Sequence, residues 1–109
     1  MIDTIKSRKD FLKIQITGDK AVTAGFILQS AINKNCNKVT RFGFTASRKV
    51  GSAVLRNKAK RRLRALVKEI LIEKGKPGMD YVLVARKTTP IRKFEKLKND
   101  LFWAINNLG

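Results

Sequence analysis

The stretch from Ala53 to Lys74 constrains the fold more than any other part of the sequence, because it contains neither proline nor glycine. Ala, Leu, Lys, Arg and Glu dominate it, and these residues favour a helix. Its apolar residues recur at helical spacing and form a stripe that must be buried against a core. We therefore expect a long amphipathic helix whose buried stripe consists of Leu55, Ala59, Leu63, Leu66 and Ile70.

Apolar patterns elsewhere predict the other elements. Residues 39–47 are a strand candidate, because Phe42, Phe44 and Ala46 alternate with residues that would lie on the opposite face. Further expected elements are a first helix over 7–16 that Ser7 caps and Gly18 ends, a strand over 26–32, a turn over 33–37, a buried strand over 79–85 and a last helix over 91–107.

The order of these elements is helix, two or three strands, helix, strand and helix. In a chain of 109 residues this order predicts one domain, residues 1–109, in which helices pack on one sheet as an α/β or α+β sandwich. Trp103 should be half-packed on the last helix, and Tyr81 should be structural. The aromatic residues expected in the core are Phe26, Phe42, Phe44, Phe94 and Phe102.

The charge balance points to a polyanionic partner. The sequence has 25 Lys and Arg against 8 Asp and Glu, a net charge of +17 and a pI near 10.8. Such a surplus attracts nucleic acid, an anionic membrane surface or an acidic protein. No apolar run is long enough to span a bilayer, and the N-terminus lacks the apolar stretch of a signal peptide. We therefore expect nucleic acid as the partner and no membrane association.

The residue types that carry most nuclease and metal chemistry are scarce. There is one cysteine, Cys36, and there is no histidine, so the chain lacks a zinc ligand set and a histidine pair for acid–base catalysis. A lone cysteine also suits a reducing cytoplasm. The carboxylates are scattered and suggest no metal clamp. We expect a cytoplasmic protein with no catalytic residue and no metal site of its own.

Six of the nine residues from Arg56 to Arg64 are cationic. On a helix Arg56, Lys60 and Arg64 lie along one side, and neighbouring like charges destabilise a helix. No acidic residue offsets them before Glu69, so phosphate groups are the natural compensation. A solvated basic face is the plain alternative, but Ser47-Arg48-Lys49 extends the basic region beyond one helix face.

The block from Arg41 to Arg64 resembles the signature of the bacterial ribonuclease P protein subunit family. In that family, a strand ending in Ser-(Lys/Arg)-Lys-(Val/Ile)-Gly precedes a helix with an Arg-Asn-Arg element, Lys-Arg and a further Arg. Lys58 departs from the pattern, because the family usually has Arg there. The resemblance covers nearly the whole chain, including Asp10-Phe11 and Tyr81 to Arg86. The matching residues of the block are Ser47, Lys49, Gly51, Arg56, Asn57, Lys60, Arg61 and Arg64.

The resemblance implies an α+β fold: an α-β-β-β-α-β-α two-layer sandwich with a left-handed β-α-β crossover, like that of a ribosomal protein. It also implies a role in removing the 5′ leader from precursor tRNA, in which the RNA subunit holds Mg²⁺ and performs the hydrolysis. The protein would bind the catalytic RNA and the precursor tRNA, would bind no cofactor alone and would need no protein oligomer. The residues implied to contact the catalytic RNA are Arg48, Lys49, Arg56, Asn57, Lys58, Lys60, Arg61, Arg62 and Arg64.

A second implied site is a cleft between the first helix and the sheet, which holds the single-stranded leader. Two residues depart from the family there: Gln15 replaces an aromatic of the first helix, and Gln29 replaces a Tyr of the central strand. We therefore expect a weaker cleft that relies more on hydrogen bonds than on stacking. The implied cleft residues are Phe11, Gln15, Ile27, Gln29, Thr45 and Ser47, with Lys60 and Arg64 at the edge.

Two other classes of protein fit the charge and size. One is a structural RNA-binding protein of the ribosomal type, which only the block from Ser47 to Arg64 disfavours. The other is a DNA-binding helix module, in which Arg56 to Arg64 would enter a major groove. The sheet-rich remainder and the lack of a helix-turn-helix pattern make the DNA-binding module the weaker of the two.

Overall fold

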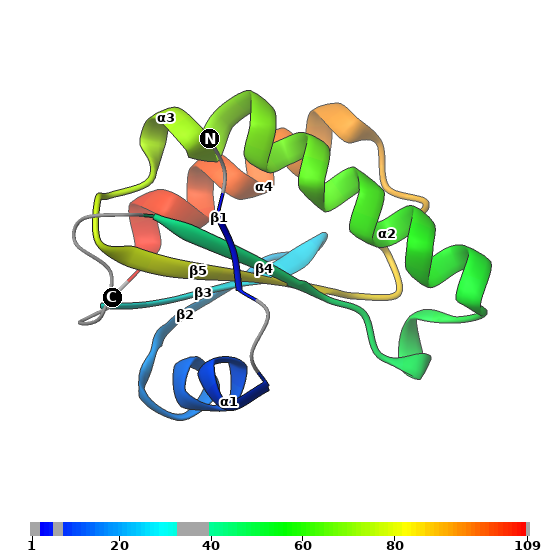
Figure 1. The fold of residues 1–109 in the computed structure, drawn as a ribbon. Helices are drawn as coiled ribbons and strands as arrows, with labels where there is room; N and C mark the ends of the chain where they lie inside the picture. Colours follow the sequence, from blue (N-terminus) through cyan, green and yellow to red (C-terminus); the bar gives the residue numbers. More distant parts are fainter. Residues whose placement is uncertain (1–2, 6–7, 33–39, 109) are drawn as a thin grey trace.

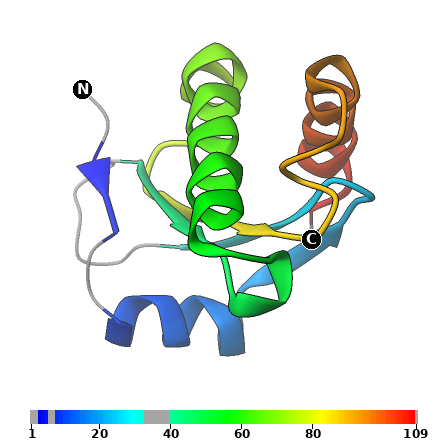
Figure 2. The ribbon, with the colours of Figure 1, turned by 90° about the vertical axis from the view of Figure 1, so that its right-hand side faces the viewer.

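The computed structural model describes residues 3–5, 8–32 and 40–108, and it consists of one sheet with helices on both faces (Figure 1). Helices α2 and α4 lie side by side on one face, and α1 lies on the other (Figure 2). The strands are β1 (Asp3–Thr4), β2 (Asp19–Val22), β3 (Phe26–Ile32), β4 (Arg41–Thr45) and β5 (Met79–Ala85). The helices are α1 (Arg8–Thr17), the 3₁₀ turn η1 (Arg48–Val50), α2 (Ala53–Leu66), the π-helical turn η2 (Val67–Leu71), α3 (Ile72–Lys74) and α4 (Phe94–Asn107).

The strand order is β1-β4-β5-β3-β2, with β4 parallel to β5 and β3 antiparallel to both β5 and β2. Seen from the helices with β4 pointing upward, β5 lies to the left of β4, so the β4–α2–β5 crossover is left-handed (Figures 1 and 2). Pattern reasoning alone favours the right-handed form. The α+β class implied by the family resemblance is confirmed, and the short strand β1 is an addition to it.

The two faces of the sheet are occupied differently. Phe26, Leu28 and Leu83 are buried in the main core beneath α2 and α4, together with Phe42 and Tyr81, whose rings stack 5.9 Å apart. On the other face Ile14 of α1 packs with Ile5 and Val82 in a small cluster, and Phe11, Ala31 and Val84 are partly buried against it. The short helix α1 therefore leaves part of its face of the sheet open.

The long helix forms as its sequence indicates. Ser52 caps α2, because its Oγ accepts a hydrogen bond from the Leu55 backbone N–H at 3.3 Å. The helix then continues through η2 into α3 and ends at Lys74 before Gly75, which matches the predicted range. The expected stripe is buried except at Leu55, which is 37% exposed and packs near Gly51 at the start of the helix.

Strands 26–32 and 79–85 have the predicted bounds, but other boundaries differ. The last helix begins at Phe94 and not at Ile91, because Ile91 and Arg92 donate backbone hydrogen bonds to the Thr88 carbonyl in a preceding turn. Phe102 is 43% exposed, so its assignment to the core was wrong. The second strand is shorter, Arg41–Thr45, and Ser7 and segment 33–39 lie outside the described residues.

Strand β2 was not separated from β3 by the sequence pattern, because only Ala21 among its four residues is buried. Trp103 is 52% exposed, which confirms the expected half-packing. The Tyr81 hydroxyl accepts a hydrogen bond from the Lys76 N–H at 2.9 Å, which confirms a structural role. None of the helices in the described residues is both long enough and apolar enough to cross a membrane.

Candidate RNA-binding surface

The turn η1 and the start of α2 hold the basic segment in a fixed orientation. Ser47 caps η1 by accepting a hydrogen bond from the Lys49 N–H at 3.3 Å, and Val50 anchors the turn in the main core. Gly51 has a φ of 140°, a conformation that favours glycine, so the chain turns sharply there into the Ser52 cap. Arg48 and Lys49 remain exposed at the end of β4.

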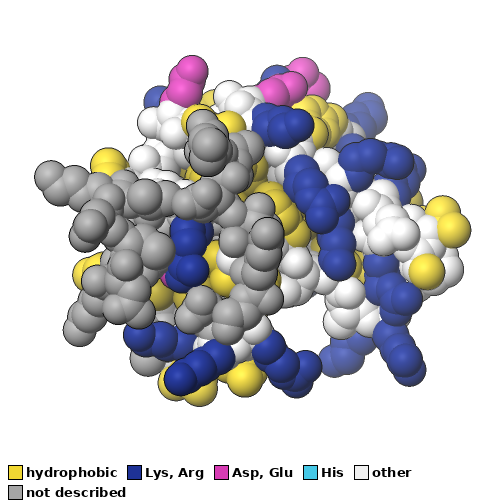
Figure 3. Space-filling model, in the orientation of Figure 1, with side chains coloured by type: hydrophobic (Ala, Val, Ile, Leu, Met, Phe, Trp, Pro, Cys, Tyr) yellow, Lys and Arg dark blue, Asp and Glu magenta, His cyan; other side chains and the backbone are white. Residues whose placement is uncertain are grey.

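Helix α2 carries its six cations with no acidic residue among them. Asn57, Lys58, Arg61 and Arg64 are exposed, whereas Arg56 and Lys60 are half-buried. In the part of the chain that the structure describes, no α2 cation forms an ion pair with a carboxylate. Figure 3 shows Lys and Arg side chains gathered over α2 and η1. We call the exposed and half-buried basic residues of η1 and α2, apart from Arg62, the basic face.

Arg64 connects the basic face to the edge of the sheet. Its guanidinium carbon lies 5.5 Å from the centre of the Phe44 ring, within the range of a cation–π contact. Phe44 points toward α2, whereas Thr45 points to the face that carries α1. Arg64 therefore lies on the α2 side of β4, near the end of the strand that β1 does not pair with.

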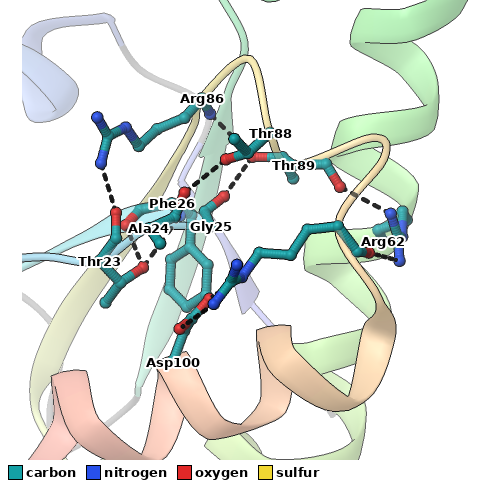
Figure 4. Close-up of polar contacts among 10 residues, drawn as sticks. Thr23, Ala24, Gly25, Phe26, Arg62, Arg86, Thr88, Thr89 and Asp100 are labelled. Carbon is teal, nitrogen blue, oxygen red and sulfur yellow. Dashed lines mark hydrogen bonds and ion pairs between the residues drawn. The ribbon is translucent and has the colours of Figure 1, made fainter.

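Arg62 points away from the other α2 cations. Its Nη1 donates a hydrogen bond to the Thr89 carbonyl at 2.8 Å, and its Nη2 donates to the Arg92 carbonyl (Figure 4). The side chain is half-buried between α2 and the segment that joins β5 to α4. The structure thus separates Arg62 from the neighbouring residues with which the sequence grouped it.

On the other side of the sheet, α1 packs closely on β4 through Phe11. A Cβ atom at Gly43 would lie only 2.7 Å from the Phe11 Cε1 atom, so the glycine allows this approach. The register pairs Gly43 with Val82 and Val82 with Gln29, and these residues form a row beneath α1. Gln29 is 6% exposed in that row, and Gln15 is exposed one helical turn after Phe11.

The next row of the same face extends beyond α1. Thr45 pairs with Val84 and Val84 pairs with Ile27, and all three are half-buried. In Figure 3 the molecule is hollowed at its lower edge between α1 and η1, with Lys and Arg side chains on both sides. The two rows, with Phe11 and Gln15 of α1, form what we call the cleft. Ser47 is exposed just past the end of β4.

Two cleft residues were not identified from the sequence. Val84 belongs to a strand with a nearly continuous apolar run, so alternation did not reveal which residues face α1. Gly43 carries no side chain, and only its register opposite Val82 shows its position. The structure brings Phe11, Ile27, Gln29 and Thr45 to one face of the sheet, as implied, while the α2 part of the basic face lies on the other and η1 extends past the end of β4 toward the α1 side (Figures 1 and 2).

Comparisons with known proteins agree with this architecture. The family described as Ribonuclease P matches residues 2–109. The ribonuclease P protein component of Paramagnetospirillum magneticum is 38% identical over 99% of this chain and 84% of that protein, and that of Ruegeria pomeroyi is 40% identical over 98% and 86%. The structure of the RNase P protein from Thermotoga maritima aligns with a TM-score of 0.80 at 25% identity, covering 98% of this chain and 99% of that one.

A chain that combines this α+β sheet with an unneutralised basic helix is typical of a protein that works with RNA. The family match covers nearly the whole chain. The chain belongs to the family of ribonuclease P protein components, which are subunits of the tRNA-processing endoribonuclease ribonuclease P.

Proposed function

We propose that the protein binds the catalytic RNA of ribonuclease P with its basic face and the 5′ leader of precursor tRNA with its cleft. The observation that carries the proposal is the absence of carboxylate partners for the α2 cations in the described residues, next to a partly open apolar groove. The α2 cations leave interactions to be completed by RNA phosphates, and the groove leaves interactions to be completed by the exposed bases of an unpaired strand.

The basic face suits structured RNA, because Arg side chains grip phosphate oxygens with a planar fork and Lys supplies a point charge. The helix N-terminus adds a partial positive charge at the end nearest η1. We leave Arg62 out, since its donors already hold two carbonyls. The proposed contacts to the catalytic RNA are Arg48, Lys49, Arg56, Asn57, Lys58, Lys60, Arg61 and Arg64.

The cleft suits an unpaired strand, because it combines an aromatic wall with an apolar floor and amide groups. Phe11 supplies the wall, Ile27 and Val84 the floor, and Gln15 and Gln29 the amides. Bases would stack on the aromatic wall, pack on the apolar floor and hydrogen-bond with the amides. The proposed contacts to the leader are Phe11, Gln15, Ile27, Gln29, Thr45 and Ser47, with Lys60 and Arg64 contributing at the β4 edge.

We propose that Mg²⁺ and the hydrolytic chemistry belong to the RNA subunit, and that the complex acts in the cytoplasm. In the described part of the chain, no group of three or more His, Cys, Asp or Glu side chains could hold a metal ion. The protein's cations would instead reduce repulsion between phosphates, so that metal ions bind the assembled RNA at lower concentration.

The decisive experiment compares cleavage of precursor tRNA by the protein alone, by the RNA subunit alone, and by both together at low Mg²⁺. We expect no cleavage by the protein, weak cleavage by the RNA and strong cleavage by the mixture. Cleavage by the isolated protein, or no effect of the protein on the RNA, would overturn the proposal. Addition of duplex DNA as a competitor tests the alternative of a DNA-binding helix, and it should not displace precursor tRNA.

A further inference from the structure

The segment that joins β5 to α4, residues 86–93, is held on two sides by hydrogen bonds (Figure 4). On the α2 side, Arg62 donates to the Thr89 and Arg92 carbonyls from the two ends of its planar fork. Because these acceptors lie three residues apart, one rigid guanidinium fixes both ends of the turn. We call residues 86–93 the connecting loop.

The other side of the connecting loop is fastened to the turn between β2 and β3. The Thr88 hydroxyl donates to the Ala24 carbonyl at 2.5 Å, and the fully buried Thr89 hydroxyl donates to the Gly25 carbonyl at 2.5 Å. The Thr89 hydroxyl also accepts a hydrogen bond from the Arg86 N–H at 2.8 Å. The loop therefore cannot shift relative to the sheet without breaking several bonds.

This fastening lies at the end of the cleft. Arg86 follows Val84 and Ala85 of β5, and its Nη1 donates to the Thr23 carbonyl at 2.6 Å, just past the end of β2. The row of Thr45, Val84 and Ile27 is therefore close to the point where β5 passes into the connecting loop. The Arg62 contacts join this end of the cleft to the helix that carries the basic face.

We propose that Arg62 is a positioning residue that fixes the connecting loop against α2 and so sets the geometry between the basic face and the leader cleft. The proposal rests on the function proposed above. Arg62 is surrounded in sequence by phosphate-binding candidates, but its donors are used inside the protein. Its removal should loosen the far end of the cleft without removing a contact to RNA.

The test uses the reconstituted complex of protein and RNA subunit, with Arg62→Gln, Arg62→Lys and, as the matched control, Arg61→Gln. For each, the dissociation constants of precursor tRNA and of mature tRNA without a leader are measured over a salt series. Arg62→Lys keeps the charge but replaces the fork with a compact ammonium, while Arg61→Gln removes an exposed cation from the adjacent position.

Both Arg62 variants should bind precursor tRNA roughly two- to thirtyfold more weakly while binding mature tRNA as the parent does, a range typical of coupling through a rigid element. The salt slope of their assembly with the RNA subunit should not change. Arg61→Gln should lower that slope by about 0.7 to 0.9, as expected for one lost phosphate contact.

The proposal is overturned if Arg62→Gln lowers the salt slope as Arg61→Gln does and Arg62→Lys restores it, because Arg62 would then be a phosphate ligand. It is equally overturned if the preference for a leader is unchanged in both variants. Thermal unfolding of each variant shows whether it is folded at the assay temperature. Should Arg62 variants be unfolded, Thr88→Val, which removes the exposed bond to Ala24, must reduce the leader preference in the same direction.

Failure of the proposed function gives a different result. In that case the unmodified protein would show no preference for precursor over mature tRNA and no assembly with the RNA subunit. The Arg62 comparison is meaningful only against a parent protein that shows both.

Discussion

At the scale of single residues, the amide of Gln15 is the feature that most distinguishes this cleft from an aromatic one. Gln15 lies one helical turn after Phe11 and is exposed. Gln15→Phe should therefore give a base a second ring to stack on and strengthen leader binding by about 1–3 kcal/mol. The measurement is the difference in affinity between precursor and mature tRNA in the reconstituted complex.

The control for that change is Ile16→Phe. Ile16 is 81% exposed on the outward side of α1, so an added ring there enlarges the apolar surface without entering the cleft. The control should leave the leader preference unchanged. An equal gain in both variants would mean that general apolar contact is responsible, and a loss in Gln15→Phe would contradict the assignment of Gln15 to the cleft.

Gly43 determines how closely Phe11 approaches the sheet. Gly43→Ala would place a methyl group 2.7 Å from the Phe11 Cε1 atom, so the ring and α1 must shift. Overpacking of this kind should lower the free energy of unfolding by about 1–3 kcal/mol. Urea unfolding of Gly43→Ala, Phe11→Leu and the double variant tests this, because the smaller side chain should recover part of the loss. Additive losses would show that Phe11 is not the obstacle.

The sequence does not show in which direction an individual side chain points. Arg61 and Arg62 are identical neighbours, yet helical geometry turns them about 100° apart. One is exposed, and the other is half-buried and bonded to two carbonyls. The sequence could group them as cations, but only the position of the connecting loop shows that Arg62 has acceptors within the protein.

At the scale of elements, the neighbouring cations of α2 destabilise the isolated helix, and a bound polyanion would offset their repulsion. Arg56→Ala and Arg61→Ala should each weaken assembly with the RNA subunit and lower the salt slope by about 0.7 to 0.9. Lys74→Ala serves as the control, since Lys74 is an exposed cation at the far end of the same helical stretch. Binding measured from low to high salt checks the prediction. Slopes equal to that of the parent protein in both α2 variants would show that the basic face is wrongly assigned.

The sequence predicts the right bounds for strands that consist of a run of apolar residues. It does not predict the bounds of elements that depend on contacts with neighbouring segments. Met79–Ala85 and Phe26–Ile32 are central strands with several buried residues, so their apolar runs end where the strands end. Strand β2 lies at the sheet edge with one buried residue and leaves little signal. The start of α4 depends on the turn at Thr88, which forms through backbone hydrogen bonds and not through apolar spacing.

At the scale of the whole molecule, the α2 part of the basic face and the cleft lie on opposite faces of one sheet, and η1 extends past the end of β4 toward the α1 side (Figures 1 and 2). The cleft lies with α1, and Arg64 of α2 contacts the ring of Phe44 near the end of β4. The sequence predicted both sets of residues, but their arrangement follows from the left-handed crossover and the strand order. Apolar periodicity predicts neither the handedness of the crossover nor the strand order, because it indicates which side of an element is buried and not where the next element lies.

The charge distribution of the whole molecule leads to a further prediction. The net charge of +17 favours the unfolded chain, in which the cations lie farther apart. An anion that binds only the folded basic face should therefore stabilise the protein, by roughly 2.7 kcal/mol when the free anion is at about 100 times its Kd. Inorganic pyrophosphate should raise the midpoint of thermal unfolding above that in chloride at equal ionic strength.

General salt effects on protein hydration would also raise the midpoint, so the variant Arg56→Ala/Arg61→Ala is the necessary comparison. It keeps the core, because Arg61 is exposed and Arg56 only half-buried, and it removes two of the six α2 cations. Its gain from pyrophosphate should be clearly smaller than that of the parent, and its stability in chloride should be equal or higher, because repulsion between neighbouring cations is reduced. An equal gain in both proteins would mean that the anion acts on the chain as a whole, and the α2 cations would then need no polyanion to stabilise them.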